Sequence, residues 1–239
     1  MSNNWLTVVC IALPFLHGCV ALQYSESNDP VDVFTREYGA VAFSAEGTSF
    51  KTEKLMRWCG PVSVYLPQNI SLRAAKSAND TLGWLSKIDG LTITRTKSIE
   101  NASLVIIVPD TEEQRDDVVD RLFPGDSRTR RKMKNSTCFF EFRTTSDHCI
   151  IAGSVVVPGY HPQELQTHCM AEELVQVMGL PNDASLGPDS IFSPGSAAST
   201  ASGRDRQMVQ LHYSKAVRPG MEKAEVLQRL RPIAAEMVE

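Results

Sequence analysis

Five short apolar segments of the chain have the residue pattern of β-strands. Val62, Val64 and Leu66 alternate with other residues, as in a strand that buries one face. Leu104–Val108 reads LVIIV, which is so uniformly apolar that it predicts a central, buried strand. The predicted strands are Pro61–Leu66, Leu91–Thr96, Leu104–Val108, Cys138–Phe142 and Ile150–Val157.

Five other segments repeat their apolar residues at helical spacing. In one of them Thr111 is an N-cap residue, and Glu112 and Glu113 follow it in the first turn. The predicted helices are Ile70–Leu85, Thr111–Phe123, Pro162–Met178, Arg204–Tyr213 and Met221–Met237. Strands and helices mixed in this order, with no internal repeat and no break, predict one α+β domain: a mixed twisted sheet packed on helices, with a helical C-terminal part.

The amino terminus has the pattern of a secretion signal. Leu6–Leu16 is an uncharged apolar stretch of about eleven residues, too short to cross a bilayer as a helix. Leu16-His17-Gly18-Cys19 follows it and resembles the bacterial lipoprotein box, in which the cysteine is acylated. We therefore expect a signal peptide over residues 1–18, lipidation of Cys19, a polar tether over 19–32 and a folded domain over 33–239.

The alternative is an ordinary cleaved signal or a buried apolar segment, because Met1–Trp5 lacks the usual Lys or Arg. If Cys19 is acylated, the protein is held at the periplasmic face of a bacterial envelope membrane. Val20, rather than Asp, follows the cysteine and favours the outer membrane. The predicted partners are this membrane and an envelope protein or peptide.

The expected signal peptide and lipid anchor assign the six cysteines to three groups. Cys10 leaves with the signal and Cys19 carries lipid, so Cys59, Cys138, Cys149 and Cys169 remain in an oxidising compartment. Four cysteines allow three complete pairings. We favour a Cys138–Cys169 disulfide, because these two flank the segment with the candidate site.

Composition excludes several classes of protein. The 239 residues are 42% hydrophobic and 22% charged with a net charge of −4, which excludes collagen-like, coiled-coil and fully disordered chains. A mild acidic excess also argues against nucleic acid as a partner. The basic cluster Arg128–Lys134 is predicted to be a solvated loop opposite the acidic run Glu112–Asp120, and a contact with acidic lipid or another polyanion is the alternative.

The most informative segment is the predicted helix Pro162–Met178 with the residues after it. Its spacing resembles the metzincin zinc motif H-E-x-x-H-x-x-G-x-x-H, in which three His bind zinc and the Glu is the general base. Glu173 and Gly179 match the Glu and Gly of the motif, and Asp183 directly follows it. The three ligand positions hold Glu172, Gln176 and Asn182 instead of His, and amide oxygens are poor zinc ligands.

Other segments extend this resemblance. Ser190-Ile191-Phe192 lies where matrixin-type metzincins have their Met-turn, and Asp205–Tyr213 resembles their closing helix. The run C-x-x-E-E-L-x-Q-x-x-G-L-P-N-D, with S-I-F and later R-P-G-M, is similar to a proteobacterial lipoprotein family, domain of unknown function 2927. This resemblance implies a metzincin-like domain with the signature helix below the sheet. The signature positions are Glu172, Glu173, Gln176, Gly179, Asn182 and Asp183.

Three hypotheses for the function follow. The first is a binding or structural lipoprotein without zinc, in which Glu172, Gln176 and Asn182 form one hydrogen-bonded cluster. The second is a metal-dependent peptidase or hydrolase with Glu173 as candidate general base and an atypical site of His168, Glu172 and Gln176, to which His161 and Asp183 come from loops. In this second case zinc is the expected cofactor; in the first there is none.

The third hypothesis is a docking module that uses the C-terminal helix. Val226, Leu230 and Ile233 form an apolar stripe along it, and such a stripe more often packs on the core.

Overall fold

The structure is a computed structural model that describes residues 28–43 and 53–238. The predicted signal peptide, Cys10, the expected lipidation site Cys19 and most of the predicted tether lie outside these residues. No helix in the described part of the chain is long and apolar enough to cross a membrane.

A six-stranded sheet forms the centre of the domain. Its main path runs β1-β6-β4-β2-β3 with every pair parallel, and β5 pairs antiparallel with the other edge of β6. The strands are β1 (Arg57–Trp58), β2 (Val62–Tyr65), β3 (Ile93–Thr96), β4 (Leu104–Ile107), β5 (Phe139–Thr144) and β6 (Cys149–Val156). β4 therefore lies between two strands, as its apolar sequence predicted.

Seven α-helices are found within the described residues. They are α1 (Pro30–Phe43), α2 (Leu72–Leu85), α3 (Glu112–Leu122), α4 (Ser127–Lys134), α5 (Gln163–Gln176), α6 (Gly203–His212) and α7 (Lys223–Val238). Thr111 caps α3, as predicted: its hydroxyl accepts a hydrogen bond from Gln114 N at 3.2 Å. The α+β class, the mixed sheet and the helical C-terminal part are confirmed.

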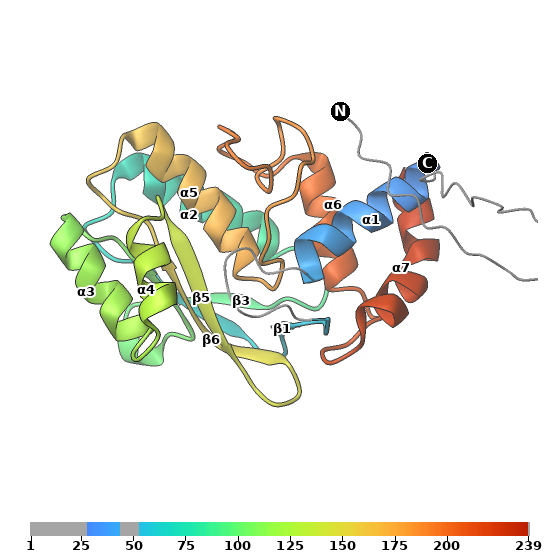
Figure 1. Cartoon of the computed structure of the whole chain (residues 1–239), viewed down its shortest axis with the longest axis horizontal. Helices are drawn as coiled ribbons and strands as arrows, with labels where there is room; N and C mark the ends of the chain where they lie inside the picture. The colour runs from blue at the N-terminus through green and yellow to red at the C-terminus, as the bar shows by residue number, and fades with distance from the viewer. Residues whose placement is uncertain (1–27, 44–52, 239) are drawn as a thin grey trace, which may run out of the picture.

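The helices cover both faces of the sheet (Figure 1). Neighbouring residues of β6 point to opposite faces: Val155 packs in the main core with α5, whereas Val156 packs with Val119 of α3 and Met133 of α4. α2 lies against α5. At the other end of the molecule α1 packs along α7, with α6 beside them (Figure 1).

Helix α4 corrects one prediction. The segment Arg128–Lys134, which we expected to be a loop, is helical because Thr129 and Met133, four residues apart, are both buried. Asp126 caps the helix by accepting a hydrogen bond from Thr129 N at 2.9 Å. The expected position opposite the acidic run is correct, since Arg130 and Lys134 pair with acids of α3.

Helix α1 was not predicted, and it overlaps the end of the predicted tether. Pro30 begins the helix, and Asp32 pairs with Arg231 of α7 at 2.8 Å. Phe34 and Tyr38 are fully buried. Residues 30–32 are therefore part of the folded domain rather than of a tether.

Candidate functional site

The signature helix α5 ends in a turn that only glycine can form. Gly179 has φ of +109°, and a Cβ atom there would lie 2.2 Å from Met56 O. Because a side chain would have to occupy the space of a backbone carbonyl, Gly179 lets the chain turn back from α5. Leu180 to Asp183 then return along the helix end, and Asp183 comes within hydrogen-bond distance of Gln176.

The three positions that match zinc ligands each bind a different protein group. Glu172 Oε2 lies 3.1 Å from His168 Nε2, one helical turn earlier. Gln176 Nε2 donates to Asp183 Oδ1 at 2.7 Å, and Asn182 Nδ2 donates to Val41 O of α1 at 3.0 Å. These side chains have separate partners and do not form the single hydrogen-bonded cluster that the first hypothesis expected.

Glu173, the candidate general base, is 5% exposed. No hydrogen bond joins its carboxyl group to another described residue. Burial, together with the nearby carboxylates of Glu172 and Asp183, raises the pKa of Glu173 well above its usual range. The neutral, protonated form of this carboxyl group therefore persists to higher pH than that of an exposed glutamate.

The potential metal ligands at this place do not fit zinc. Cys138 Sγ and carboxylate oxygens of Glu172 and Glu173 lie within 4.8 Å of one another. However, Cys138 forms a disulfide with Cys169, so its sulfur is not a thiolate ligand. The two adjacent carboxylates alone fall short of the three or four protein ligands that zinc sites use.

Both disulfides lie near the ends of strands. The predicted Cys138–Cys169 pair is confirmed and links the residue before β5 to α5. The second pair, Cys59–Cys149, links the residue after β1 to the start of β6. The four cysteines of the domain are therefore all paired.

The three histidines near the signature helix in sequence are separated in space. His168 Nδ1 lies 2.6 Å from Ala198 O, and its hydrogen bond with Glu172 raises the pKa of His168. The His161 ring instead contacts Thr137 O at 3.1 Å, and His148 lies in the β5–β6 turn beside Gly220. Of the atypical site His168, Glu172 and Gln176, only the first two are in contact.

The turn Ser190-Ile191-Phe192 is held by one buried carboxylate. Asp205, which is fully buried, accepts hydrogen bonds from Ser190 Oγ at 2.6 Å and from Ile191 N at 3.1 Å. It also accepts one from Ser202 N in a capping box at the start of α6. The turn and the closing helix, which the sequence singled out separately, are thus a single unit.

Sequence reasoning missed a buried polar group at the end of α6. His212 Nε2 donates to Met56 O at 2.8 Å, so Nδ1 is the acceptor for the Tyr38 hydroxyl at 3.1 Å. Burial lowers the pKa of His212 to about 3, which keeps the ring neutral. The neighbouring Tyr213 hydroxyl donates to Met178 O at 2.9 Å. The pair His212-Tyr213 at the end of the predicted helix Arg204–Tyr213 was the signal available for this group.

The fold and the site define a disulfide-bonded α+β domain whose signature helix carries two adjacent carboxyl groups, the half-buried Glu172 and the buried Glu173. The chain belongs to the family described as protein of unknown function (DUF2927), whose model matches residues 32–232. No curated protein and no solved structure matches the chain.

Proposed function

We propose that this protein is a bacterial cell-envelope lipoprotein whose metzincin-like domain binds or supports an envelope protein or peptide and does not cleave it. The observation that carries this proposal is the state of the signature positions. Glu172 and the amide nitrogens of Gln176 and Asn182 are bound to protein groups. Asn182 Oδ1 is buried without a hydrogen-bond partner among the described residues, and Glu173 is buried with a raised pKa.

The contacts around α5 support the metzincin-like part of the proposal. The turn at Gly179 follows the helix as the motif requires, and the Ser190–Phe192 turn is bonded to the closing helix α6 through Asp205. Tyr213 then bonds back to the end of the signature helix. The chain thus keeps the contacts that hold the turn and the closing helix against α5, while the side chains at the ligand positions bond to protein groups. This combination supports a domain that binds a partner and does not cleave it.

The two disulfides support the envelope location. Disulfides persist in oxidising compartments such as the bacterial periplasm and are rare in the cytosol. The lipoprotein box ending in Cys19 supports anchoring to a membrane, favouring the outer membrane.

Metal content and peptide cleavage test the binding role. We expect the purified chain to hold well under one zinc per molecule and to leave a mixture of unfolded substrate proteins intact. The sharpest test variant is Glu173→Gln. Its matched control is Glu164→Gln, which changes an exposed carboxyl group of the same helix. One tightly bound zinc per chain, or a cleavage activity that Glu173→Gln removes and Glu164→Gln keeps, would overturn the proposal in favour of a metal-dependent hydrolase.

Labelling with radioactive palmitate tests the anchor. We expect label on the wild-type chain and none on Cys19→Ala, which should also leave the membrane fraction. Equal labelling of both chains, or a wild-type chain without label, contradicts lipidation of Cys19.

A further inference from the structure

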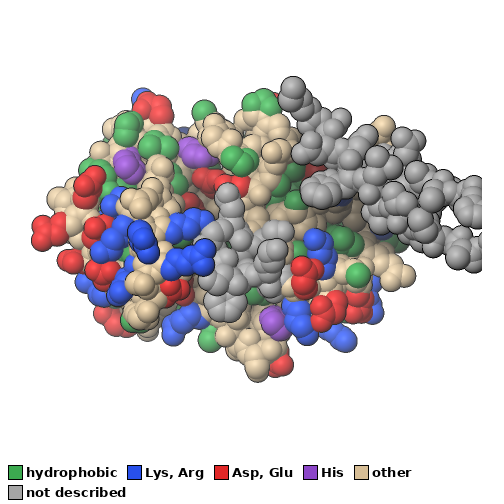
Figure 2. Space-filling view, in the orientation of Figure 1, with side chains coloured by type: hydrophobic (Ala, Val, Ile, Leu, Met, Phe, Trp, Pro, Cys, Tyr) green, Lys and Arg blue, Asp and Glu red, His purple; other side chains and the backbone are tan. Residues whose placement is uncertain are grey.

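Helix α4 carries a dense positive charge on an acidic protein. Five of its eight residues are Arg or Lys: Arg128, Arg130, Arg131, Lys132 and Lys134. Thr129 and Met133 are buried against the sheet, so the cations extend from the other sides of the helix. Figure 2 shows Lys and Arg side chains gathered over α4 and the neighbouring strand β5.

Only part of this charge is compensated within the described chain. Arg130 and Lys134 face α3, where Asp120 lies 3.7 Å from the first and 3.0 Å from the second. Lys134 also lies 3.8 Å from Asp116. Arg130 and Lys134 thus neutralise the acids of α3 that lie nearest to α4. These acids do not cancel the charge of the other three cations of α4.

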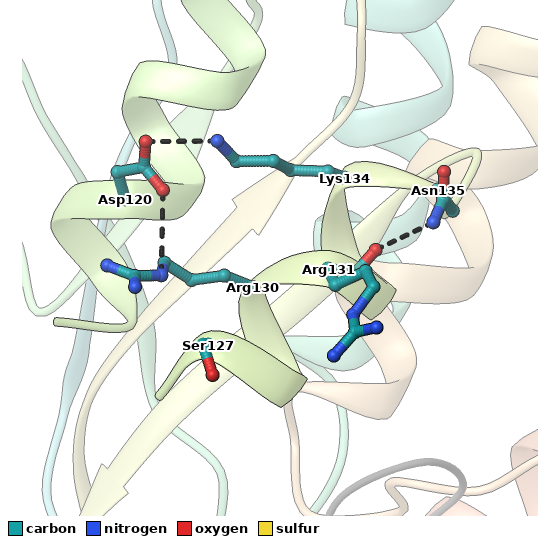
Figure 3. Close-up of a pocket in the computed structure, with 6 residues that line it drawn as sticks. All are labelled: Asp120, Ser127, Arg130, Arg131, Lys134 and Asn135. Carbon is teal, nitrogen blue, oxygen red and sulfur yellow. Dashed lines mark hydrogen bonds and ion pairs between the residues drawn. The ribbon is translucent and has the colours of Figure 1, made fainter. Parts of the chain in front are cut away.

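The other three cations, Arg128, Arg131 and Lys132, are exposed and make no ion pair with another described residue. In Figure 3 the Arg131 guanidinium extends away from Asp120, which lies between Arg130 and Lys134. A cluster of unpaired cations on one short helix has a positive local potential, although the whole chain has a net charge of −4.

An open pocket beside these cations has the chemistry for a phosphate group. Its volume is about 480 Å³, and its lining residues are Asp120, Ser127, Arg130, Arg131, Lys134 and Asn135. Arg131 supplies a planar guanidinium that can bind two phosphate oxygens, and the Ser127 hydroxyl is a further donor. With Asp120 already paired to Arg130 and Lys134, an anion here meets a site with excess positive charge.

We propose that the outer face of α4, made by Arg128, Arg131 and Lys132 with the pocket at Ser127, binds the phosphate headgroups of anionic phospholipids. The choice of lipid rests on the proposed function, because an acylated Cys19 would hold the domain close to a bilayer. The start of α1, which follows the tether, and helix α4 lie at opposite ends of the molecule (Figure 1), so this face meets the bilayer when the long axis lies along the membrane. Ten residues separate Cys19 from Pro30, and they span at most about 40 Å when extended. That length keeps the domain beside the membrane, where each weak charge contact acts at high local concentration.

Vesicle binding tests the proposal without using the lipid anchor. The full chain carrying Cys19→Ser, which cannot be acylated, is floated with vesicles of phosphatidylcholine alone or with 30% phosphatidylglycerol, on the order of a natural anionic content. Binding to vesicles of phosphatidylcholine alone measures any contribution of the apolar segment Leu6–Leu16. The additional binding to vesicles with phosphatidylglycerol measures the charge contact. We expect phosphatidylglycerol to increase binding, and 0.5 M NaCl to remove the increase.

A matched pair of triple variants locates the contact. Arg128→Gln/Arg131→Gln/Lys132→Gln should weaken the phosphatidylglycerol-dependent binding by about fivefold per cation, on the order of 100-fold in all. Lys87→Gln/Lys97→Gln/Lys215→Gln removes the same charge from exposed positions outside α4 and should bind as the parent chain does. All six side chains are exposed, so both variants should keep the parent's melting temperature within a few degrees.

Three results would overturn the proposal: no increase with phosphatidylglycerol, an equal loss in both triple variants, or tighter binding to soluble polyphosphate or an oligonucleotide than to the vesicles. Because palmitate labelling tests the anchor separately on the wild-type chain, failure of the anchor and failure of this lipid contact are distinguishable.

Discussion

At the scale of single residues, Gly179 after α5 is the position where the structure requires one particular amino acid. Gly179 combines a positive φ with contact against the Met56 carbonyl and the His212 ring. The Met56 carbonyl and the His212 ring are also hydrogen-bonded to each other, so the turn after α5, the residue before β1 and the closing helix α6 meet at this one position.

Gly179→Ala should therefore lower the free energy of unfolding by several kcal/mol, because both the backbone conformation and the space exclude a methyl group. Gly83→Ala is the matched control: Gly83 lies in α2, where an added methyl group would meet no atom from the rest of the fold within 4 Å, and alanine there should add about 0.5–1 kcal/mol. Urea unfolding of the two variants measures both effects. Similar stability of Gly179→Ala and wild type would contradict the tight turn.

The buried carboxyl of Glu173 should make stability depend on pH. Its pKa is raised in the folded state and returns to its ordinary value of about 4.5 in the unfolded chain. Above pH 4.5 the unfolded chain releases this proton while the folded chain retains it, so the free energy of unfolding falls as pH rises through this interval. The loss is about 1.4 kcal/mol for each pH unit until the raised pKa is reached.

Glu173→Gln keeps the size of the side chain and removes the proton. Its stability relative to wild type should increase as the pH rises above 4.5 and level off once the raised pKa is passed, as measured by urea unfolding at each pH. Glu164→Gln, at an exposed position of the same helix, should show no such trend. Parallel pH curves for Glu173→Gln and wild type would show that Glu173 ionises normally.

At the scale of the elements, the C-terminal helix is part of the core. Val226, Leu230 and Ala234 of α7 are fully buried, and the helix packs along α1. The apolar stripe that could have formed a docking surface is thus covered by the chain itself. Ion pairs of Asp32 with Arg231 and of Glu37 with Arg204 join α1 to α7 and α6.

Leu230→Ala should cost about 2–5 kcal/mol, since it leaves a cavity between α7 and the core. Arg229→Ala, next to it in sequence but half-exposed and ion-paired with Glu225, should cost about 0.5 kcal/mol or less. Thermal unfolding of both variants distinguishes a packing helix from a docking helix. A small, equal effect of the two substitutions would favour docking.

At the scale of the whole molecule, the two disulfides join segments that are distant in sequence. Cys138 and Cys169 are separated by 31 residues, and Cys59 and Cys149 by 90. Loop-closure entropy in the unfolded chain gives contributions of about 4 and about 5 kcal/mol.

Replacing either pair by alanine should lower stability by about this amount, with the larger loss for Cys59→Ala/Cys149→Ala. The same argument predicts poor folding in a reducing cytoplasm and good folding after export, measured as the soluble yield of the wild-type chain in each compartment. Equal yields together with unchanged stability of the alanine variants would contradict a role of the disulfides in folding.

The local elements were predictable because each is encoded by neighbouring residues. Alternation in β2, the uniform apolar run of β4 and the Thr111 cap of α3 each identify their element without distant contacts. Helix α4 was not predictable in this way. Its eight residues are mostly charged, and the helix depends on Thr129 and Met133 being buried under the sheet.

The candidate site was predictable in position but not in its bonds. The spacing of Glu173 and Gly179 located the helix and turn, and the flanking cysteines gave the correct Cys138–Cys169 pair. The partners of Glu172, Gln176 and Asn182 depend on where α1 and the returning loop pack, and α1 itself was missed. Asn182 bonds Val41, which is 141 residues away in sequence.

The sequence by itself determined the α+β class, the order of the elements, the signature helix with its glycine turn and the residues at each signature position. These features follow from hydrophobic period, caps and motif spacing, which act over a few residues. Only the tertiary structure decided that Glu173 is buried among carboxylates, that His212 joins Tyr38 to Met56 and that α4 is a helix with three unpaired cations. Burial and charge pairing depend on which distant segments meet, and folding brings those segments together.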